Sequence, residues 1–395
     1  MFFYDLVLDY TKIMTSKNQN INEEQIFFAG SDYFSVLLHD IARAYKSIEL
    51  ETYIFELDPL GKKIIAALTK AAKRGVAVRL LVDGAGTPQW NSPAVKSLEQ
   101  AGTETRVFHP FPWRLWQWSR SHIKAPSLLK LIYLFLKINA RNHRKVCVID
   151  KKIAYVGSFN ISKQHLGKNY DGGGWRDTGV RLEHIDLKDL LLAFEAAWTH
   201  LPIQERIRHF FRHIRTNPII RLNNAWYRRR ILYKNLLQRI KSCKNRVWIT
   251  NAYFVPDNFL LRCLNEAAYL GIDVRILLPQ ESDVAFMPWA SQAFYARLLK
   301  AGVRIFEYKP SVLHAKTLII DNWMTIGSSN LNHRSLRHDL EVDINVRLSE
   351  SKQLLEHQFL LDLQSSKEIF LVDWQKRPWY QNLVGRVLLY LKYLI

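Results

Sequence analysis

Apolar residues follow two different spacings that alternate along the chain. Residues 48–55 and 247–254 are short runs rich in β-branched and aromatic residues, as strands are. Residues 60–74 and 257–270 carry apolar positions at helical spacing, and each stretch ends at a glycine. A second short apolar run, suited to a buried strand, follows each glycine. Strands that alternate with helices predict an α/β fold in which many strands pair in parallel.

The same order of segments occurs twice. SIELETYIFELD corresponds to RVWITNAYFVPD, GVAVRLLVD to GIDVRILLP, and AGTETRVFHP to AGVRIFEYKP. A series of similar segments repeated in one order indicates an internal duplication. We therefore predict two homologous α/β/α sandwich halves, residues 1–205 and 206–395, with a boundary near residues 200–215.

The first half carries an insertion near residues 111–141 that the second half lacks. It contains SLLKLIYLFLKINAR, in which Lys130 and Lys137 interrupt an otherwise apolar helical stretch, and tryptophans interleaved with arginines precede it. This composition fits a helix lying in the headgroup region of a bilayer. The C-terminal stretch NLVGRVLLYLKYLI predicts a second amphipathic segment. The alternative is that both helices are buried within the protein.

The charge of the chain favours polyanionic partners. Its 395 residues carry a formal net charge of +20, and residues 206–244 are rich in arginine and lysine. Such a protein is attracted to nucleic acid or to an anionic membrane surface. Charge alone does not distinguish the two.

Several classes of protein are disfavoured. Three cysteines without CxxC spacing argue against a disulfide framework or a zinc site and fit the reducing cytosol. Asp5 and Asp9 interrupt the apolar N-terminus, which argues against a secretory signal. No uncharged apolar run of about 18 residues occurs, so no membrane-spanning helix is expected.

The motif H-x-K-x-x-x-x-D occurs once in each half. Its residues are His143, Lys145 and Asp150 in the first copy and His314, Lys316 and Asp321 in the second. A histidine and a lysine two positions apart share one face of a strand, where the ammonium can neutralise a phosphate and the imidazole can attack it or donate a proton. The aspartate has an odd offset, so we favour a role in fixing the turn. A single copy could be an exposed strand end, but two copies indicate a site.

Each motif precedes a Gly-Ser-x-Asn sequence. Ser158 and Asn160 follow the first copy, and Ser328 and Asn330 follow the second. A hydroxyl and an amide beside a tight turn could bind the oxygens of a phosphate. We therefore predict that these four residues form part of the site.

If the halves pack about a pseudo-two-fold axis, both histidines can face one phosphodiester at the interface. One imidazole would attack phosphorus, and the other would protonate the departing alcohol. Asp177 and Glu341 are predicted to orient the imidazoles through Nδ1, although the sequence does not indicate which carboxylate serves which histidine. This chemistry requires no metal and no cofactor.

A duplicated HxKxxxxD followed by GSxN resembles the phospholipase D superfamily, and the text ETYIFELD, NHRKVCVID, WRDTGVRLE and GSSNLNHRS is most similar to the bacterial cardiolipin synthases. The resemblance implies transfer of a phosphatidyl group through a phosphohistidine to phosphatidylglycerol, with His143 as nucleophile and His314 as acid and base. It implies a peripheral enzyme on the cytoplasmic face of the bacterial inner membrane. The phosphatidyl donor stays open among phosphatidylglycerol, phosphatidylethanolamine and a nucleotide-activated lipid. Two features depart from the family: Asp339-Leu340-Glu341 replaces Asn-x-Glu, and the N-terminal transmembrane helices are missing.

Three other functions remain open at this point. A nuclease of the same superfamily would use the basic charge to bind nucleic acid. A phospholipase D-type hydrolase or a phosphatidylserine synthase would use the same nucleophile with another acceptor. A membrane-binding scaffold without activity is disfavoured, because both motifs are intact.

Overall fold

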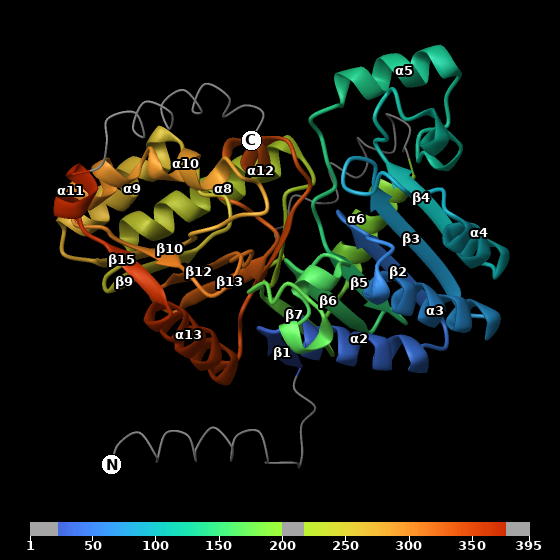
Figure 1. The fold of residues 1–395 in the computed structure, drawn as a ribbon, viewed down its shortest axis with the longest axis horizontal. Helices are drawn as coiled ribbons and strands as arrows, with labels where there is room; N and C mark the ends of the chain where they lie inside the picture. The colour runs from blue at the N-terminus through green and yellow to red at the C-terminus, as the bar shows by residue number, and fades with distance from the viewer. Residues whose placement is uncertain (1–22, 200–216, 377–395) are drawn as a thin grey trace.

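A computed structural model of the protein describes residues 23–199 and 217–376. It shows two α/β units side by side (Figure 1). The predicted boundary near residues 200–215 and the whole of the predicted C-terminal amphipathic segment lie outside the described residues, as do Asp5 and Asp9.

Residues 23–199 contain a seven-stranded mixed sheet. Its strands are β1 (Glu24–Phe27), β2 (Ser47–Thr52), β3 (Ala77–Asp83), β4 (Glu104–Phe108), β5 (Val146–Ile149), β6 (Ile153–Gly157) and β7 (Gly179–Glu183). The order across the sheet is β1-β7-β6-β5-β2-β3-β4. Only β2, β3 and β4 pair in parallel, because β5 to β7 form an antiparallel meander that carries the first motif.

Residues 217–376 form an eight-stranded sheet with the same core order. Its strands are β8 (Ile220–Leu222), β9 (Arg246–Thr250), β10 (Asp273–Pro279), β11 (Arg304–Tyr308), β12 (Thr317–Ile320), β13 (Trp323–Gly327), β14 (Val342–Asn345) and β15 (Ser366–Ile369). The order is β15-β11-β10-β9-β12-β13-β14-β8. Taken in the reverse direction, the six strands β14-β13-β12-β9-β10-β11 correspond to β7-β6-β5-β2-β3-β4 of the first sheet. The prediction of a duplicated α/β fold is confirmed.

Helices cover both faces of each sheet. In the first unit α2 (Gly30–Arg43), α3 (Pro59–Lys73) and α4 (Pro93–Gln100) pack on one face, and α6 (Lys188–Trp198) packs on the other. In the second unit α8 (Trp226–Ser242), α9 (Asn258–Tyr269), α10 (Met287–Gln292), α11 (Tyr295–Lys300) and α14 (Leu371–Gln375) face α13 (Ser349–Gln364) across the sheet. The short helix α12 (His333–Arg337) follows the second GSxN sequence.

Matching local signals begin and end the corresponding helices. Asp58 caps α3 by accepting a hydrogen bond from the Gly61 N–H, and Asp257 caps α9 in the same way. The glycines that follow adopt left-handed backbone angles, with φ of 89° at Gly75 and 84° at Gly271. These glycines explain why both predicted helices end where they do.

The two units share an apolar core. Val156 of β6 and Val180 of β7 lie in one buried cluster with Val342 and Ile344 of β14. This packing brings the ends of β5 and β12, which carry the two motifs, toward the same interface.

The insertion stands apart from the sheets. It comprises a short 3-10 helix, η1 (Leu115–Arg120), and α5 (Ser127–Leu136), which projects from the first unit (Figure 1). The predicted helix continues to residue 141, whereas α5 ends at Leu136. Within the described residues, no helix combines the length and apolar character needed to cross a bilayer.

Candidate active site

The two motif segments cross into the opposite half of the molecule. The His143 N–H donates to the Leu340 carbonyl at 3.0 Å, and the His314 N–H donates to the Arg176 carbonyl at 2.8 Å. Leu340 precedes Glu341, and Arg176 precedes Asp177. The backbone therefore places each histidine beside the carboxylate of the other half.

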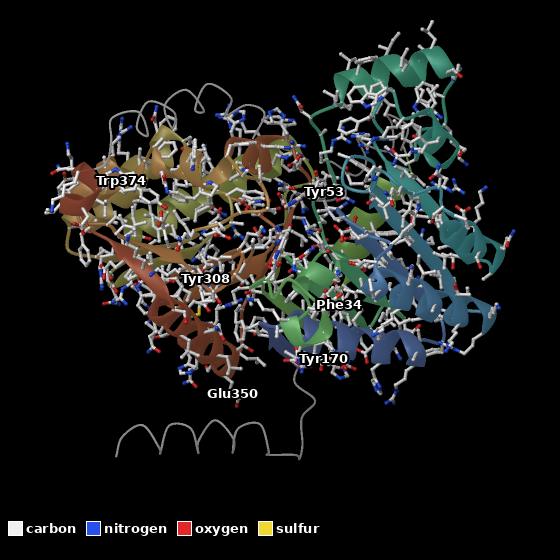
Figure 2. All side chains as sticks on the ribbon, viewed as in Figure 1. Phe34, Tyr53, Tyr170, Tyr308, Glu350 and Trp374 are labelled. Atoms are coloured by element: carbon white, nitrogen blue, oxygen red, sulfur yellow. The ribbon has the colours of Figure 1, made fainter. Side chains whose placement is uncertain are left out.

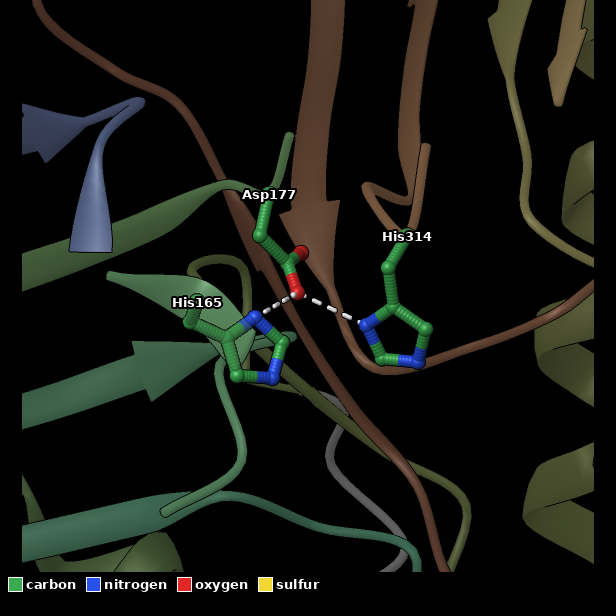
Figure 3. A group of neighbouring side chains, drawn as sticks. All are labelled: His165, Asp177 and His314. Atoms are coloured by element: carbon green, nitrogen blue, oxygen red, sulfur yellow. Dashed lines mark hydrogen bonds and ion pairs between the residues drawn. The ribbon is translucent and has the colours of Figure 1, made fainter. Parts of the chain in front are cut away.

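The side chains complete this crossed arrangement. His143 Nδ1 lies 3.0 Å from both carboxylate oxygens of Glu341, and His314 Nδ1 lies 2.7 Å from Asp177 Oδ2 (Figure 3). A carboxylate at Nδ1 fixes the hydrogen there and leaves the Nε2 lone pair for chemistry. All four side chains are buried.

The two histidines share one electrostatic environment. Burial lowers the pKa of His143 well below its ordinary value, and the charges of Lys145, Lys316 and His314 lower it further. Burial, followed by Lys316, lowers the pKa of His314 to about 4 even though Asp177 opposes the shift. Both imidazoles are therefore neutral near pH 7 before an anion binds, which is the form required of a nucleophile or a base.

The lysines are buried beside the histidines. Lys145 Nζ donates to the His143 carbonyl at 2.7 Å, and Lys316 Nζ donates to the His314 carbonyl. Burial lowers the pKa of Lys145 to about 7 and that of Lys316 to about 8, although carboxylates oppose both shifts. A phosphodiester anion in the pocket would favour their charged forms.

The motif serines contact carboxylates. Ser158 Oγ donates to Asp177, and Ser328 Oγ donates to Glu341 Oε2 at 2.5 Å. A hydroxyl has a single hydrogen to donate, so each serine holds the orienting carboxylate of its own half. The structure thus gives these hydroxyls a partner other than the phosphate expected from the sequence.

The motif asparagines lie at the turns after β6 and β13, and both are buried. Asn160 Oδ1 accepts from the Ile54 N–H at 3.3 Å. Asn330 Oδ1 has no hydrogen-bond partner in the described part of the chain. Phosphate contact by these two side chains stays a prediction.

The motif aspartates lie at the far ends of their strands. Asp150 follows β5 and Asp321 follows β12, whereas the histidine and lysine precede those strands, so about 13 Å of strand separates them. Asp321 accepts from the backbone N–H groups of three consecutive residues, Lys244 to Arg246, at 2.8–3.0 Å. Asp150 makes the same contacts with Tyr45 to Ser47. We assign both aspartates a structural role.

Replacing Asp321 with alanine should therefore affect stability more than chemistry. Three backbone N–H groups would lose a charged acceptor, and the residue adopts a positive φ of 49° that alanine disfavours. We expect the free energy of unfolding to fall by about 2 to 4 kcal/mol in urea titration, with kcat within about threefold of wild type. Asp321→Asn, which tolerates this φ, should lose less. A loss of kcat above about 100-fold in a folded Asp321→Ala protein would contradict the structural role.

Several residues near the histidines were not recognised in the sequence. The Tyr53 ring packs edge-on against His143 at 5.0 Å, and Tyr253 lies 6.3 Å from His314. Their only sequence signal was a position shortly after the ends of β2 and β9. His165 and Ser335 were also missed, although each stands five positions after the asparagine of its GSxN sequence.

His165, Asp177 and His314 have ligand atoms within 4.8 Å of one another, close enough to hold a metal ion. Their hydrogen bonds do not favour one. The Asn160 N–H donates to His165 Nε2 at 3.2 Å, which puts the ring hydrogen on Nδ1, the atom facing Asp177. An Nδ1 that carries a hydrogen has no lone pair to give to a metal.

Comparison with known proteins agrees with this geometry. The family model described as cardiolipin synthase, PLD-like domain matches residues 37–173 and 236–363. A cardiolipin synthase from Clostridium perfringens is 33% identical over 369 residues, covering 90% of this chain and 73% of the relative. A cardiolipin synthase from Staphylococcus aureus is 31% identical over 367 residues, covering 90% and 70%.

Solved structures show the same fold at low sequence identity. The phosphatidylserine synthase of Haemophilus influenzae superposes with a TM-score of 0.67 at 12% identity and covers 95% of this chain and 94% of that one. The polyphosphate kinase of Porphyromonas gingivalis gives a TM-score of 0.52 at 11% identity and covers 86% and 50%. The family match and the curated relatives, together with the duplicated fold, show that the chain belongs to the cardiolipin synthase family of the phospholipase D superfamily.

Proposed function

We propose that the protein makes cardiolipin by transferring a phosphatidyl group to the hydroxyl of phosphatidylglycerol. The observation that supports this most strongly is the pair of buried histidines, each held at Nδ1 by a carboxylate of the opposite half. Two imidazoles that each contact a carboxylate through Nδ1 and keep Nε2 for chemistry suit a phosphodiester that is attacked at one side and loses its alcohol at the other.

In the first step His143 Nε2 attacks phosphorus. A P–N bond forms, the bond from phosphorus to the departing alcohol breaks, and that alcohol oxygen takes a proton from His314 Nε2. The bound anion and Asp177 raise the proton affinity of His314 for this step, against the effect of burial. Lys145 and Lys316 stabilise the charge on the phosphoryl oxygens.

In the second step His314 acts as a base. Its Nε2 takes the proton from the hydroxyl of phosphatidylglycerol while that oxygen attacks phosphorus. The P–N bond breaks, and the electron pair returns to His143. Water in place of phosphatidylglycerol would give hydrolysis, so exclusion of water by the lipid decides between transfer and hydrolysis.

The proposed substrate is tested with purified protein and defined lipid pairs. Vesicles containing phosphatidylglycerol alone, or phosphatidylethanolamine with labelled phosphatidylglycerol, should yield cardiolipin that mass spectrometry identifies. Phosphatidic acid without cardiolipin would favour a hydrolase, and phosphatidylserine formed from added serine would favour a phosphatidylserine synthase. Cleavage of DNA without turnover of any lipid would favour the nuclease.

The enzyme should reach its lipid through the insertion, residues 111–141. Helix α5 presents an outward stripe of apolar side chains at helical spacing that no other part of the described chain covers. Its members, with their exposed fractions, are Leu128 (68%), Leu129 (59%), Ile132 (49%), Phe135 (54%) and Leu136 (78%). Trp113 and Trp116 of the same insertion are also about half exposed.

We propose that this stripe inserts into an anionic bilayer. Lys124 and Lys137 flank α5 and are exposed, and the net charge of +20 attracts the chain to acidic headgroups. Lys130, one of the two lysines that interrupt the apolar stretch, donates to the Trp118 carbonyl at 3.3 Å and so links α5 to η1. The arrangement fits a peripheral protein, which we place on the cytoplasmic face of the bacterial inner membrane.

The docking helix is tested with vesicles containing phosphatidylglycerol. Leu129→Glu and Leu136→Glu should each weaken sedimentation with the vesicles about tenfold, because each removes the insertion of one exposed leucine. The control is Tyr170→Glu, which changes a side chain that is 60% exposed on the opposite side of the first unit (Figure 2). Equal binding by all three variants and the wild type would rule out α5 as the docking element.

A further inference from the structure

The two orienting carboxylates are held by chemically different groups. In the second half, Ser335 Oγ accepts from the Asn330 N–H at 3.0 Å and donates to Glu341 Oε1. The serine therefore bridges the GSxN turn to the carboxylate that contacts His143. It provides a neutral hydroxyl at this point.

A histidine makes the corresponding bridge in the first half. His165 Nε2 accepts from the Asn160 N–H at 3.2 Å, and His165 Nδ1 lies 3.2 Å from Asp177 Oδ2 (Figure 3). His165 and Ser335 both stand five positions after the asparagine of their GSxN sequences, so the duplicated frame brings them to equivalent places. The difference lies in the group that contacts the carboxylate.

The hydrogen bond from Asn160 determines what His165 can do. Because the N–H points at Nε2, the ring hydrogen lies on Nδ1 and faces Asp177. Nδ1 lies 3.2 Å from Asp177 Oδ2 and forms no hydrogen bond of normal geometry within residues 23–199 and 217–376, so its contact with the carboxylate is electrostatic. The ring is enclosed by Phe159 and Trp175 at 5.6 and 5.3 Å.

Asp177 consequently has an unusually rich set of donors. It accepts from His314 Nδ1 at 2.7 Å, from the Thr178 N–H at 2.9 Å and from Ser158 Oγ, and His165 Nδ1 lies 3.2 Å from its Oδ2. Burial alone would raise the pKa of Asp177, but the two histidines outweigh burial and hold the pKa well below its usual value. Burial raises the pKa of Glu341 to about 7, and its serines only reduce that shift.

We propose that His165 is a positioning residue whose Nδ1–H keeps Asp177 ionised and fixed beneath His314. The inference rests on the proposed function, because it concerns the histidine that transfers protons. His314 gains a partner that ionises more readily than the Glu341 partner of His143, and this suits a group that must be protonated and deprotonated in each cycle. The difference gives two equivalent histidines distinct roles.

Two substitutions separate this role from support of the GSxN turn. His165→Gln keeps an acceptor near the Nε2 position for Asn160 but removes the donor to Asp177. His165→Asn keeps a donor near the Nδ1 position but removes the acceptor. Both are assayed on phosphatidyl p-nitrophenol in phosphatidylglycerol vesicles, against wild-type enzyme, with folding monitored by circular dichroism.

His165→Gln should lower kcat about 10- to 100-fold with little change in KM, because one N–H contact with a charged group is lost. His165→Asn should recover most of this activity. The acid limb of the kcat profile should move up by about one pH unit in His165→Gln, since Asp177 with one N–H contact fewer attracts the His314 imidazolium more strongly and raises the pKa of His314. Ser335→Ala should leave that limb in place.

The other titratable groups that face Asp177 and His314 are unchanged in these variants; they are Tyr33, Lys145, Tyr253, Asp283 and Lys316, with His143. Equal losses in the two His165 variants, or a wild-type rate and acid limb in His165→Gln, would overturn the proposal. A wild-type enzyme that releases p-nitrophenol but forms no cardiolipin would instead count against the proposed acceptor, and the comparison of variants would still stand.

Discussion

Replacing either motif histidine with alanine is expected to lower cardiolipin formation by at least about 10⁴-fold. His143→Ala removes the atom that forms the P–N bond, and His314→Ala removes the group that gives and takes the proton. Both side chains are buried and hydrogen-bonded at Nδ1. Initial rates of labelled cardiolipin formation in vesicles provide the measurement.

The two alanine variants should differ when the leaving group is activated. p-Nitrophenolate departs without a proton, so His314→Ala should still release it in the first step, whereas His143→Ala should not. Asp321→Ala is a suitable control, because it changes the same motif at the far end of β12. Cardiolipin formation by either histidine variant within about tenfold of wild type would exclude a mechanism that needs both imidazoles.

The crossed carboxylates lead to the second prediction. Asp177→Asn should lower kcat by about 10² to 10⁴-fold. The amide can stabilise the wrong tautomer of His314, and because it is neutral it does not stabilise the positive charge of the protonated imidazole. Glu341→Gln should act on His143 in the same way. Both effects should appear in kcat more than in KM.

Double variants test which carboxylate serves which histidine. Because Asp177 contacts His314, adding Asp177→Asn to His314→Ala should cost little further activity. Adding Glu341→Gln to His314→Ala should instead lower the remaining release of p-nitrophenolate, because Glu341 orients the nucleophile His143. If Asp177→Asn lowered p-nitrophenolate release in the His314→Ala background and Glu341→Gln did not, the crossed assignment would be wrong.

The sequence was sufficient to predict the frame of the molecule. Strand and helix patterns, repeated in order, gave the duplicated α/β fold, and the motif with its GSxN sequence indicated the family; the structure and the comparisons confirm both. Gly75 and Gly271 have positive φ, which explains why the C-terminal ends of α3 and α9 were predicted accurately. These features are determined by residues that lie close together along the chain, so a single sequence is enough to predict them.

The pairing of side chains could not be predicted in the same way. Glu341 is 198 positions from His143, and Asp177 is 137 positions from His314. Their contacts depend on how the two sheets pack through β6, β7 and β14, which no local pattern encodes. The sequence therefore identified both carboxylates but did not assign them.

The roles of hydroxyl groups were equally hidden. Ser158 and Ser328 follow the motifs at a spacing that suggested phosphate binding, yet tertiary packing turns their hydroxyls toward carboxylates. His165 gave no motif signal, because its importance depends on the Asn160 N–H and on the position of Asp177. His165 and Ser335 stand at the same distance after their GSxN sequences. A residue-by-residue alignment of the two repeats would therefore have shown that a histidine in the first half replaces a serine in the second.

The most direct test of the account is to trap the phosphatidyl group on the enzyme. His314→Ala should be mixed with phosphatidyl p-nitrophenol, quenched in base, which preserves a phosphohistidine, and digested for mass spectrometry. The account predicts a burst of about one p-nitrophenolate per protein and a phosphatidyl adduct on the peptide containing His143, with neither in His143→Ala. An adduct on another residue, or an equal burst from His143→Ala, would contradict the relay between the two histidines.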